Sequence, residues 1–157
     1  MVMNMRDILY LVGFVAICLA VGGVSGYFTA GGVREWFPTL VKPSFNPPSW
    51  VFAPVWTVLY IMMGIAAWLV WRNGGDISLP VWLFFMQLAF NFLWSFLFFN
   101  LHRPDLALVD IGLLWISIAA TLYAFWQVDL RAGLLLVPYL AWVSFASVLN
   151  AAIWRLN

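Results

Sequence analysis

Charged residues in this chain fall at the boundaries of long apolar runs and are nearly absent inside them. Each run is long enough to cross a bilayer, which takes roughly 20 apolar residues in a helix. Barrel strands would instead alternate over about 10 residues. We therefore predict an all-α membrane protein, a five-transmembrane-helix bundle that forms a single domain over residues 1–157. The predicted spans are residues 8–28, 50–71, 77–101, 106–127 and 132–154.

Composition supports a membrane location. Only 8% of the residues are charged and 66% are hydrophobic, whereas soluble domains carry about 25% charged residues. The chain therefore lacks the polar groups to cover a soluble globule. A net charge of +1 with no basic run predicts no nucleic-acid partner. Cys18 and His102 are each single, which predicts no disulfide and no metal site.

The first apolar run allows a second interpretation, a cleaved signal peptide, because Arg6 precedes it. The run is longer than a typical signal sequence and no clear cleavage site follows, which favours a span. Gly22 and Gly26 indicate either a close helix contact or fraying towards the following loop. The connection over residues 29–49 is rich in aromatic residues and proline, and we predict an ordered cap at the membrane surface. The charges on its side of the membrane, four against three, lean towards a cytoplasmic cap.

The segment of residues 42–60 combines four prolines with aromatic residues. Proline fixes φ and restricts the preceding residue, so this approach to the second span is stiff. Phe52, Trp56 and Tyr60 then recur every four residues and share one helix face. Such a face is either a packing seam between helices or the wall of a pocket for a flat apolar ligand.

Polar residues within the spans are the next candidates. Gln87, Asn91 and Ser95 share one face of the third span and should point into the bundle, as helix-joining groups or as cavity groups. Pro138 is expected to kink the fifth span, where Trp142 precedes a small residue, Ala146, by one turn. For Asp110 we expect an interfacial or capping carboxylate. Three tryptophans lie too deep for an interfacial belt and are predicted to line a cavity: Trp56, Trp94 and Trp142.

With these residues in order, the whole chain resembles the TspO/MBR family, also described as tryptophan-rich sensory proteins, translocator proteins or peripheral-type benzodiazepine receptor-like proteins. The resemblance rests on motifs at matching separations along the chain. They are Lys42-Pro43-x-x-x-Pro47-Pro48, Trp56-Thr-x-Leu-Tyr60, Gln87-Leu-x-x-Asn91-x-x-Trp94 and Val137-Pro-Tyr-Leu-Ala-Trp142, followed by Leu149-Asn150 and Trp154-Arg155.

The resemblance implies a homodimer whose pocket, beneath the loop between the first two helices, binds porphyrins or isoquinoline-type molecules. This chain has Phe45 where the family often has tryptophan, which keeps stacking but not indole redox chemistry. Ala151 and Ala152 stand where the mammalian sterol motif needs tyrosine, so we do not predict sterol binding there. The implied ligand-binding residues are Phe45, Phe52, Trp56, Tyr60, Asn91, Trp94, Trp142, Ala146 and Leu149.

These features predict a porphyrin-binding membrane receptor or sensor in a bacterial cell membrane, involved in tetrapyrrole handling or stress signalling. No cofactor is required, porphyrin is a ligand rather than a cofactor, and Arg34 and Lys42 are candidates to meet its propionates. The alternative is light-dependent porphyrin degradation that uses Trp56 and Trp142; the spans show no acid–base pair or nucleophile. A small transporter is a second alternative, although five spans do not divide into two repeats.

Overall fold

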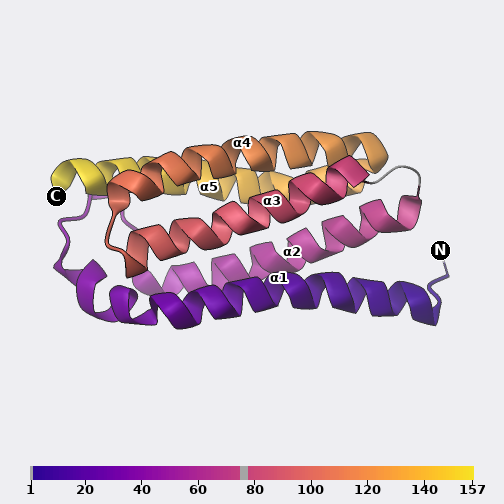
Figure 1. Cartoon of the computed structure of the whole chain (residues 1–157), viewed down its shortest axis with the longest axis horizontal. Coiled ribbons are helices and arrows are strands. Elements are labelled where there is room, and N and C mark those ends of the chain that lie inside the picture. Colours follow the sequence, from indigo (N-terminus) through magenta and orange to yellow (C-terminus); the bar gives the residue numbers. More distant parts are fainter. Residues whose placement is uncertain (1, 75–77) are drawn as a thin grey trace.

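The computed structural model describes residues 2–74 and 78–157. Within them, five long α-helices lie side by side as an elongated bundle, with the N- and C-terminal ends of the chain at opposite ends (Figure 1). Each helix is long and apolar enough to cross a membrane, which confirms the predicted fold class. The helices are α1 (Met5–Gly31), α2 (Phe52–Asn73), α3 (Ser78–Ser95), α4 (Pro104–Val128) and α5 (Leu130–Leu156).

The first helix is longer than predicted at both ends. It begins with a capping box, in which Asn4 and Asp7 each accept a hydrogen bond from the other's backbone N–H. Helical structure continues past Gly31 as a π-helix, η1 (Gly32–Trp36), and a 3-10 helix, η2 (Phe37–Thr39). The predicted connection of residues 29–49 is therefore helical over its first half. The physical reason is packing, since the aromatic side chains of this segment contact Phe98 and Phe99 in the turn that follows α3.

The other boundaries follow local backbone rules. The predicted turn at residues 73–76 lies partly outside the described residues, as does Ile77; in the described part, Gly74 ends α2 with a φ of 71°. A π-helix, η4 (Phe96–Asn100), extends α3, and the 3-10 helix η3 (Ser49–Val51) leads into α2. Pro104 occupies the first turn of α4, where its missing N–H has no partner to lose. The helix α5 remains continuous through Pro138.

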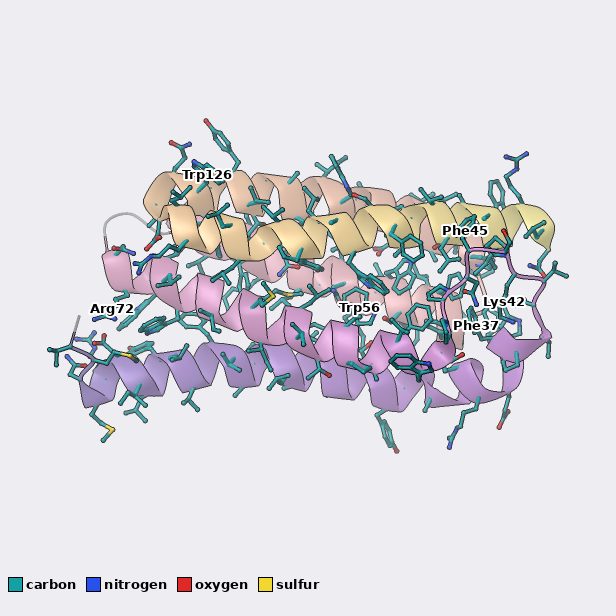
Figure 2. All side chains as sticks on the ribbon, turned by 180° about the vertical axis from the view of Figure 1, so that it is seen from behind. Phe37, Lys42, Phe45, Trp56, Arg72 and Trp126 are labelled. Atoms are coloured by element: carbon teal, nitrogen blue, oxygen red, sulfur yellow. The ribbon has the colours of Figure 1, made fainter. Side chains whose placement is uncertain are left out.

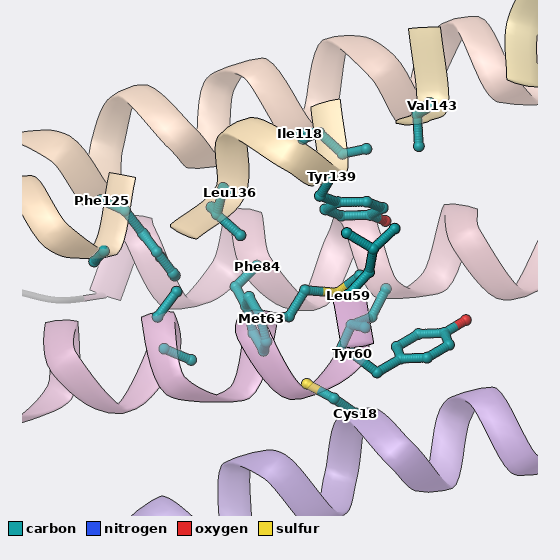
Figure 3. Packing of buried hydrophobic residues seen from close by; sticks show 14 of the residues in the cluster. Cys18, Leu59, Tyr60, Met63, Phe84, Ile118, Phe125, Leu136, Tyr139 and Val143 are labelled. Atoms are coloured by element: carbon teal, nitrogen blue, oxygen red, sulfur yellow. The ribbon is translucent and has the colours of Figure 1, made fainter. Parts of the chain in front are cut away.

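The helices differ in how deeply they are buried. In the most apolar 18 residues of each span, 11% of the residues are buried for α1 and 50% for α2. The helix α1 is therefore peripheral, and α2 is central. The core between α2, α3, α4 and α5 is filled by large side chains (Figure 3). Its fully buried members include Met63, Phe84, Phe125, Leu136 and Tyr139. One end of the bundle is therefore a solid apolar core.

The prediction for Asp110 is wrong. Its side chain is 4% exposed, and neither carboxylate oxygen has a hydrogen-bond partner among the described residues. It does not cap α4, because the helix begins six residues earlier at Pro104 and Asp110 faces the bundle from its second turn. The sequence placed Asp110 near a helix end but did not show which helix face packs inward.

Candidate functional site

An aromatic cluster surrounds Trp56 near the middle of the bundle (Figure 2). The Trp56 ring centroid lies 5.8 Å from that of Tyr60, and 6.5 Å from those of Trp94 and Trp142. Tyr139 completes the cluster with an edge contact at 6.3 Å. Aromatic pairs at these distances stabilise by about 0.5–1.5 kcal/mol beyond their area burial. The predicted aromatic face of α2 thus points inward, to α3 and α5.

A cavity of about 470 Å³ lies between this cluster and α1; we call it the large cavity. Its volume is within the range of about 300–1,000 Å³ typical of small-molecule sites. Its walls come from the second half of α1 with η1 and η2, from the start of α2 with η3, and from the end of α3 with η4. The lining residues are Leu19, Gly22, Gly23, Ser25, Gly26, Thr29, Val33, Phe37, Ser49, Phe52, Ala53, Trp56, Thr57, Tyr60, Trp94, Ser95 and Phe99.

A second cavity of about 30 Å³, the small cavity, lies on the α5 side of the cluster. Its volume is about that of one water molecule, so it does not accommodate an organic ligand as it stands. Trp142, Ala146 and Leu149 line this small cavity and not the large one. The rings of Phe52, Trp56 and Trp94 contribute to both. The structure therefore separates a pocket that the sequence treated as one.

Two of the predicted site residues line neither cavity. Phe45 is 47% exposed and makes an edge contact with Phe145, at a centroid distance of 6.3 Å. Figure 2 shows Phe45 at the loop end of the bundle, near Lys42 and Phe37. Asn91 is buried, and its side chain makes hydrogen bonds to the hydroxyls of Tyr60 and Tyr139. Ligand contact for the whole predicted set remains a prediction.

A chain of buried polar side chains joins three helices beneath the aromatic cluster. The Tyr60 hydroxyl donates to Asn91 Oδ1 at 2.7 Å, and Asn91 Nδ2 donates to the Tyr139 hydroxyl at 2.8 Å. The Tyr139 hydroxyl in turn donates to Gln87 Oε1 at 2.7 Å. Asn91 and Gln87 therefore serve as helix-joining groups, whereas Ser95, the third member of the predicted face, lines the large cavity. Because the Asn91 amide makes two hydrogen bonds within the bundle, a ligand that bonds to it must replace one of them.

The two deep indoles of α3 and α5 differ in their hydrogen bonding. Trp94 Nε1 donates to Asn150 Oδ1 at 2.9 Å, and Asn150 Nδ2 donates to the Pro104 carbonyl, which ties α3, α4 and α5 together. Trp142 Nε1 is buried and has no hydrogen-bond partner among the described residues. A buried donor without a partner costs about 1–3 kcal/mol, unless a bound molecule supplies an acceptor.

The polar groups near the loop are mostly engaged locally. Lys42 Nζ donates to the Leu40 carbonyl and lies 4.9 Å from the Phe37 ring centroid. His102 stacks on Trp36 at 4.4 Å. Arg34 and Arg155 are exposed and form no ion pair within the described part of the chain, so both are available cations at this end.

Charges at the opposite end join the helix termini. The carboxylate of Asp7 lies 3.6 Å from the Arg72 guanidinium, and the carboxylate of Asp129 accepts hydrogen bonds from Asn73 and Arg131. The hydrogen bond from Arg131 is the main cause that lowers the pKa of Asp129 to about 2. This end is therefore closed by ion pairs and hydrogen bonds.

The lining residues on α1 were not predicted. The signal available was the run of small residues from Gly22 to Gly26, which we interpreted as a helix contact or as fraying. Gly22 does form a close contact, because an added Cβ would lie 2.6 Å from the Tyr60 ring. Gly26 faces open space, and α1 does not fray there. One glycine thus brings the helices together, and the other leaves room.

The geometry defines a class: a polytopic helical membrane protein with an aromatic-walled cavity and no charged lining residue among those described. The TspO/MBR family profile matches residues 14–155. A tryptophan-rich protein TspO from Chlorobaculum tepidum is 49% identical over 155 residues, covering 97% of this chain and 98% of that protein. The tryptophan-rich sensory protein of Cereibacter sphaeroides is 41% identical, covering 99% and 95%, and the human translocator protein is 41% identical, covering 85% and 82%. The chain belongs to the TspO/MBR family and is a multi-pass membrane protein.

Proposed function

We propose that this protein is a membrane receptor or sensor that binds porphyrins, such as protoporphyrin IX, and flat isoquinoline-type molecules in the large cavity. The single observation that carries the proposal is the cavity of about 470 Å³ with walls of Trp56, Trp94, Phe52 and Phe99. Aromatic faces stack on a flat π system, and most of the remaining lining is apolar. Binding would then affect tetrapyrrole handling or stress signalling.

The polar contacts suit a porphyrin without metal. None of the described residues that line either cavity is a histidine, and His102 is stacked on Trp36. An axial ligand of the kind that haem proteins use is therefore not provided at the cavity. Arg34, exposed at the loop end, supports contact with a propionate there. Trp142 Nε1 has no partner among the described residues, so it would donate a hydrogen bond to a ligand acceptor that reaches past the Trp56 ring.

The test is a titration of the purified protein in lipid nanodiscs with protoporphyrin IX, followed by the shift of its Soret band. We expect saturable binding that weakens by about 2- to 10-fold in Trp56→Phe and in Trp94→Phe, because the phenyl ring is smaller than the indole and covers less of the porphyrin face. Trp126→Phe is the matched control, because Trp126 is 44% exposed at the end remote from the cavity (Figure 2). Absence of saturation, or an equal effect of the control, contradicts the proposal.

A second candidate function is light-dependent porphyrin degradation. The observation that favours it is the contact between Trp56 and Trp142, whose ring centroids are 6.5 Å apart at the boundary of the two cavities. Dioxygen from solution would be the oxidant. Illumination of the porphyrin complex should then bleach the Soret band in the wild type and much less in Trp56→Phe and Trp142→Phe. Equal bleaching in all three proteins would leave binding without catalysis.

The proposal also includes a homodimer in a bacterial cell membrane. The relatives from Chlorobaculum tepidum and Cereibacter sphaeroides support the bacterial location. The homodimer follows from the family resemblance. Size-exclusion chromatography with light scattering on the detergent-solubilised protein tests it, and a mass of one chain per particle after subtraction of detergent would contradict it.

A further inference from the structure

The large cavity is open towards the side of the bundle, between α1 and α2. Several of its lining residues are themselves exposed on the outer surface: Gly23 and Gly26 of α1, and Ala53 and Thr57 of α2. All four lie within the membrane-spanning helices. We infer that hydrocarbon surrounds the opening at this level, because the helices on both sides of it are long and apolar enough to cross the bilayer. The opening therefore faces the bilayer interior.

Two tight contacts of α1 explain why the opening is there. Gly22 lies against the ring of Tyr60, and Gly32 lies directly against the backbone carbonyl of Phe99. The Asn100 side chain also donates to the Phe28 carbonyl, at 3.3 Å, next to the second contact. Between these contacts, a Cβ added at Gly23 or at Gly26 would meet no atom within 4 Å. The helix is thus held close at both ends of a stretch in which Gly23 and Gly26 carry no side chain to close the gap.

We propose that ligands reach the large cavity sideways from the bilayer, through a portal formed by Gly23, Gly26, Ala53 and Thr57. The inference deepens the proposed function and rests on it for the identity of the ligand. It defines the ligand class as molecules whose apolar body enters the hydrocarbon core while any charged group stays at the membrane surface. On this proposal, ligands can pass between α1 and α2 because Gly23 and Gly26 carry no side chain.

The chemistry of the lining agrees with such a ligand. Thr29 Oγ1 donates to the Ser25 carbonyl at 2.8 Å, and Thr57 Oγ1 donates to the Ala53 carbonyl at 2.8 Å. These hydroxyl protons are already used by the helix backbone, so the hydroxyls meet a ligand mainly as weak acceptors. A molecule that enters from hydrocarbon gives up no hydrogen bonds to its surroundings, and it needs few in the cavity.

The experiment measures access without requiring porphyrin binding. Ser95→Cys places a thiol on the cavity wall in a Cys18→Ala background, which removes the only native cysteine. The protein in nanodiscs is treated either with a long-chain N-alkylmaleimide, which dissolves in the bilayer, or with a sulfonated maleimide, which stays in water. Mass spectrometry follows the modified fraction with time. Ser25→Cys, on the α1 side of the cavity, is a second reporter.

The portal is then closed with Gly26→Leu. The matched control is Gly13→Leu, because Gly13 is also on α1, also has no atom within 4 Å of an added Cβ, and does not line the cavity. We expect the long-chain reagent to modify the thiol faster than the sulfonated one. Gly26→Leu should slow the long-chain reagent about tenfold, which corresponds to about 1.4 kcal/mol of added barrier. Gly13→Leu should leave the rate unchanged.

Modification mainly by the sulfonated reagent, or equal rates in the two leucine variants, would overturn the portal. The porphyrin titration succeeds or fails separately. Saturable porphyrin binding with no effect of Gly26→Leu on the thiol rates would refute the portal and keep the receptor. A portal without porphyrin binding would refute the proposed ligand and keep the lipid-side route.

Discussion

The two ends of the α1–α2 pair use glycine in opposite ways. Towards the N-terminus, a Cβ on Gly64 would lie 2.5 Å from the Cα of Val15, so the two helices touch backbone to backbone. Towards the loop, Gly23 and Gly26 have no neighbour within 4 Å, and the large cavity occupies the space. The same residue type therefore closes one half of the interface and opens the other, depending on the distance between the helices.

The ion pair between helix ends lies in the closed half, whereas the loop end is tied by two hydrogen bonds between the Val41 backbone and the Asn157 side chain. The closed end is joined by the Asp7–Arg72 pair and by the hydrogen bond that Asn73 donates to Asp129. At the loop end, Lys42 is engaged with its own loop and Arg34 is unpaired within the described residues. The comparison indicates that close helix contact and ligand space are provided by different halves of one bundle.

The largest effect is expected where the two helices are closest. Gly64→Leu should lower the free energy of unfolding by about 1–3 kcal/mol or more, because α1 must move away from its contact at Val15. Gly26→Leu, in the open half, should change stability by no more than about 0.5–1 kcal/mol, and in the stabilising direction, because leucine favours helix more than glycine does. Unfolding in mixed micelles with increasing SDS measures both. Similar losses in the two variants would break the comparison.

An intermediate effect is expected where the halves meet, at the buried polar chain. Asn91→Leu removes the partner of both the Tyr60 and the Tyr139 hydroxyls, which should cost about 1–2 kcal/mol. The same unfolding assay, applied as a double-mutant cycle with Tyr60→Phe, should give a coupling energy of at least about 0.5 kcal/mol. Strict additivity would show that the hydrogen bond does not join α2 to α3.

The smallest effect is expected at the closed end. Asp129 accepts a hydrogen bond from the Arg131 backbone N–H at the start of α5. Asp129→Ala should therefore lower stability by about 1 kcal/mol at neutral pH, the usual cost of losing an N-cap. Asp129→Asn is the control, because asparagine keeps the cap but not the charge.

The pH dependence of this contribution has a definite sign. The pKa of Asp129 is lowered to about 2 from an ordinary value of 3.8. A lowered acid pKa means that the ionised group stabilises the fold above about pH 4, and that this stabilisation is lost as the pH falls through about 2. The stability difference between the wild type and Asp129→Asn should shrink over that window. A difference that stays constant from neutral pH to pH 2 would show that the charge of Asp129 has no role.

Some features could be predicted because they depend on local pattern alone. The five spans follow from the length of the apolar runs, and the inward face of Phe52, Trp56 and Tyr60 follows from their four-residue spacing. The interior position of Gln87 and Asn91 follows from the cost of leaving amides in hydrocarbon. These are properties of single helices in a known solvent.

Other features depend on how the helices sit against one another, and the tertiary structure alone decided them. The chain pattern placed Trp142 and Trp56 in one pocket, but the rings of Phe52, Trp56 and Trp94, which line both cavities, divide it into a large and a small one. It placed Asp110 at an interface, whereas packing buries it without a partner among the described residues. Spacing fixes which side chains share a helix face; the distance to the neighbouring helix fixes whether a glycine there becomes a contact or an opening.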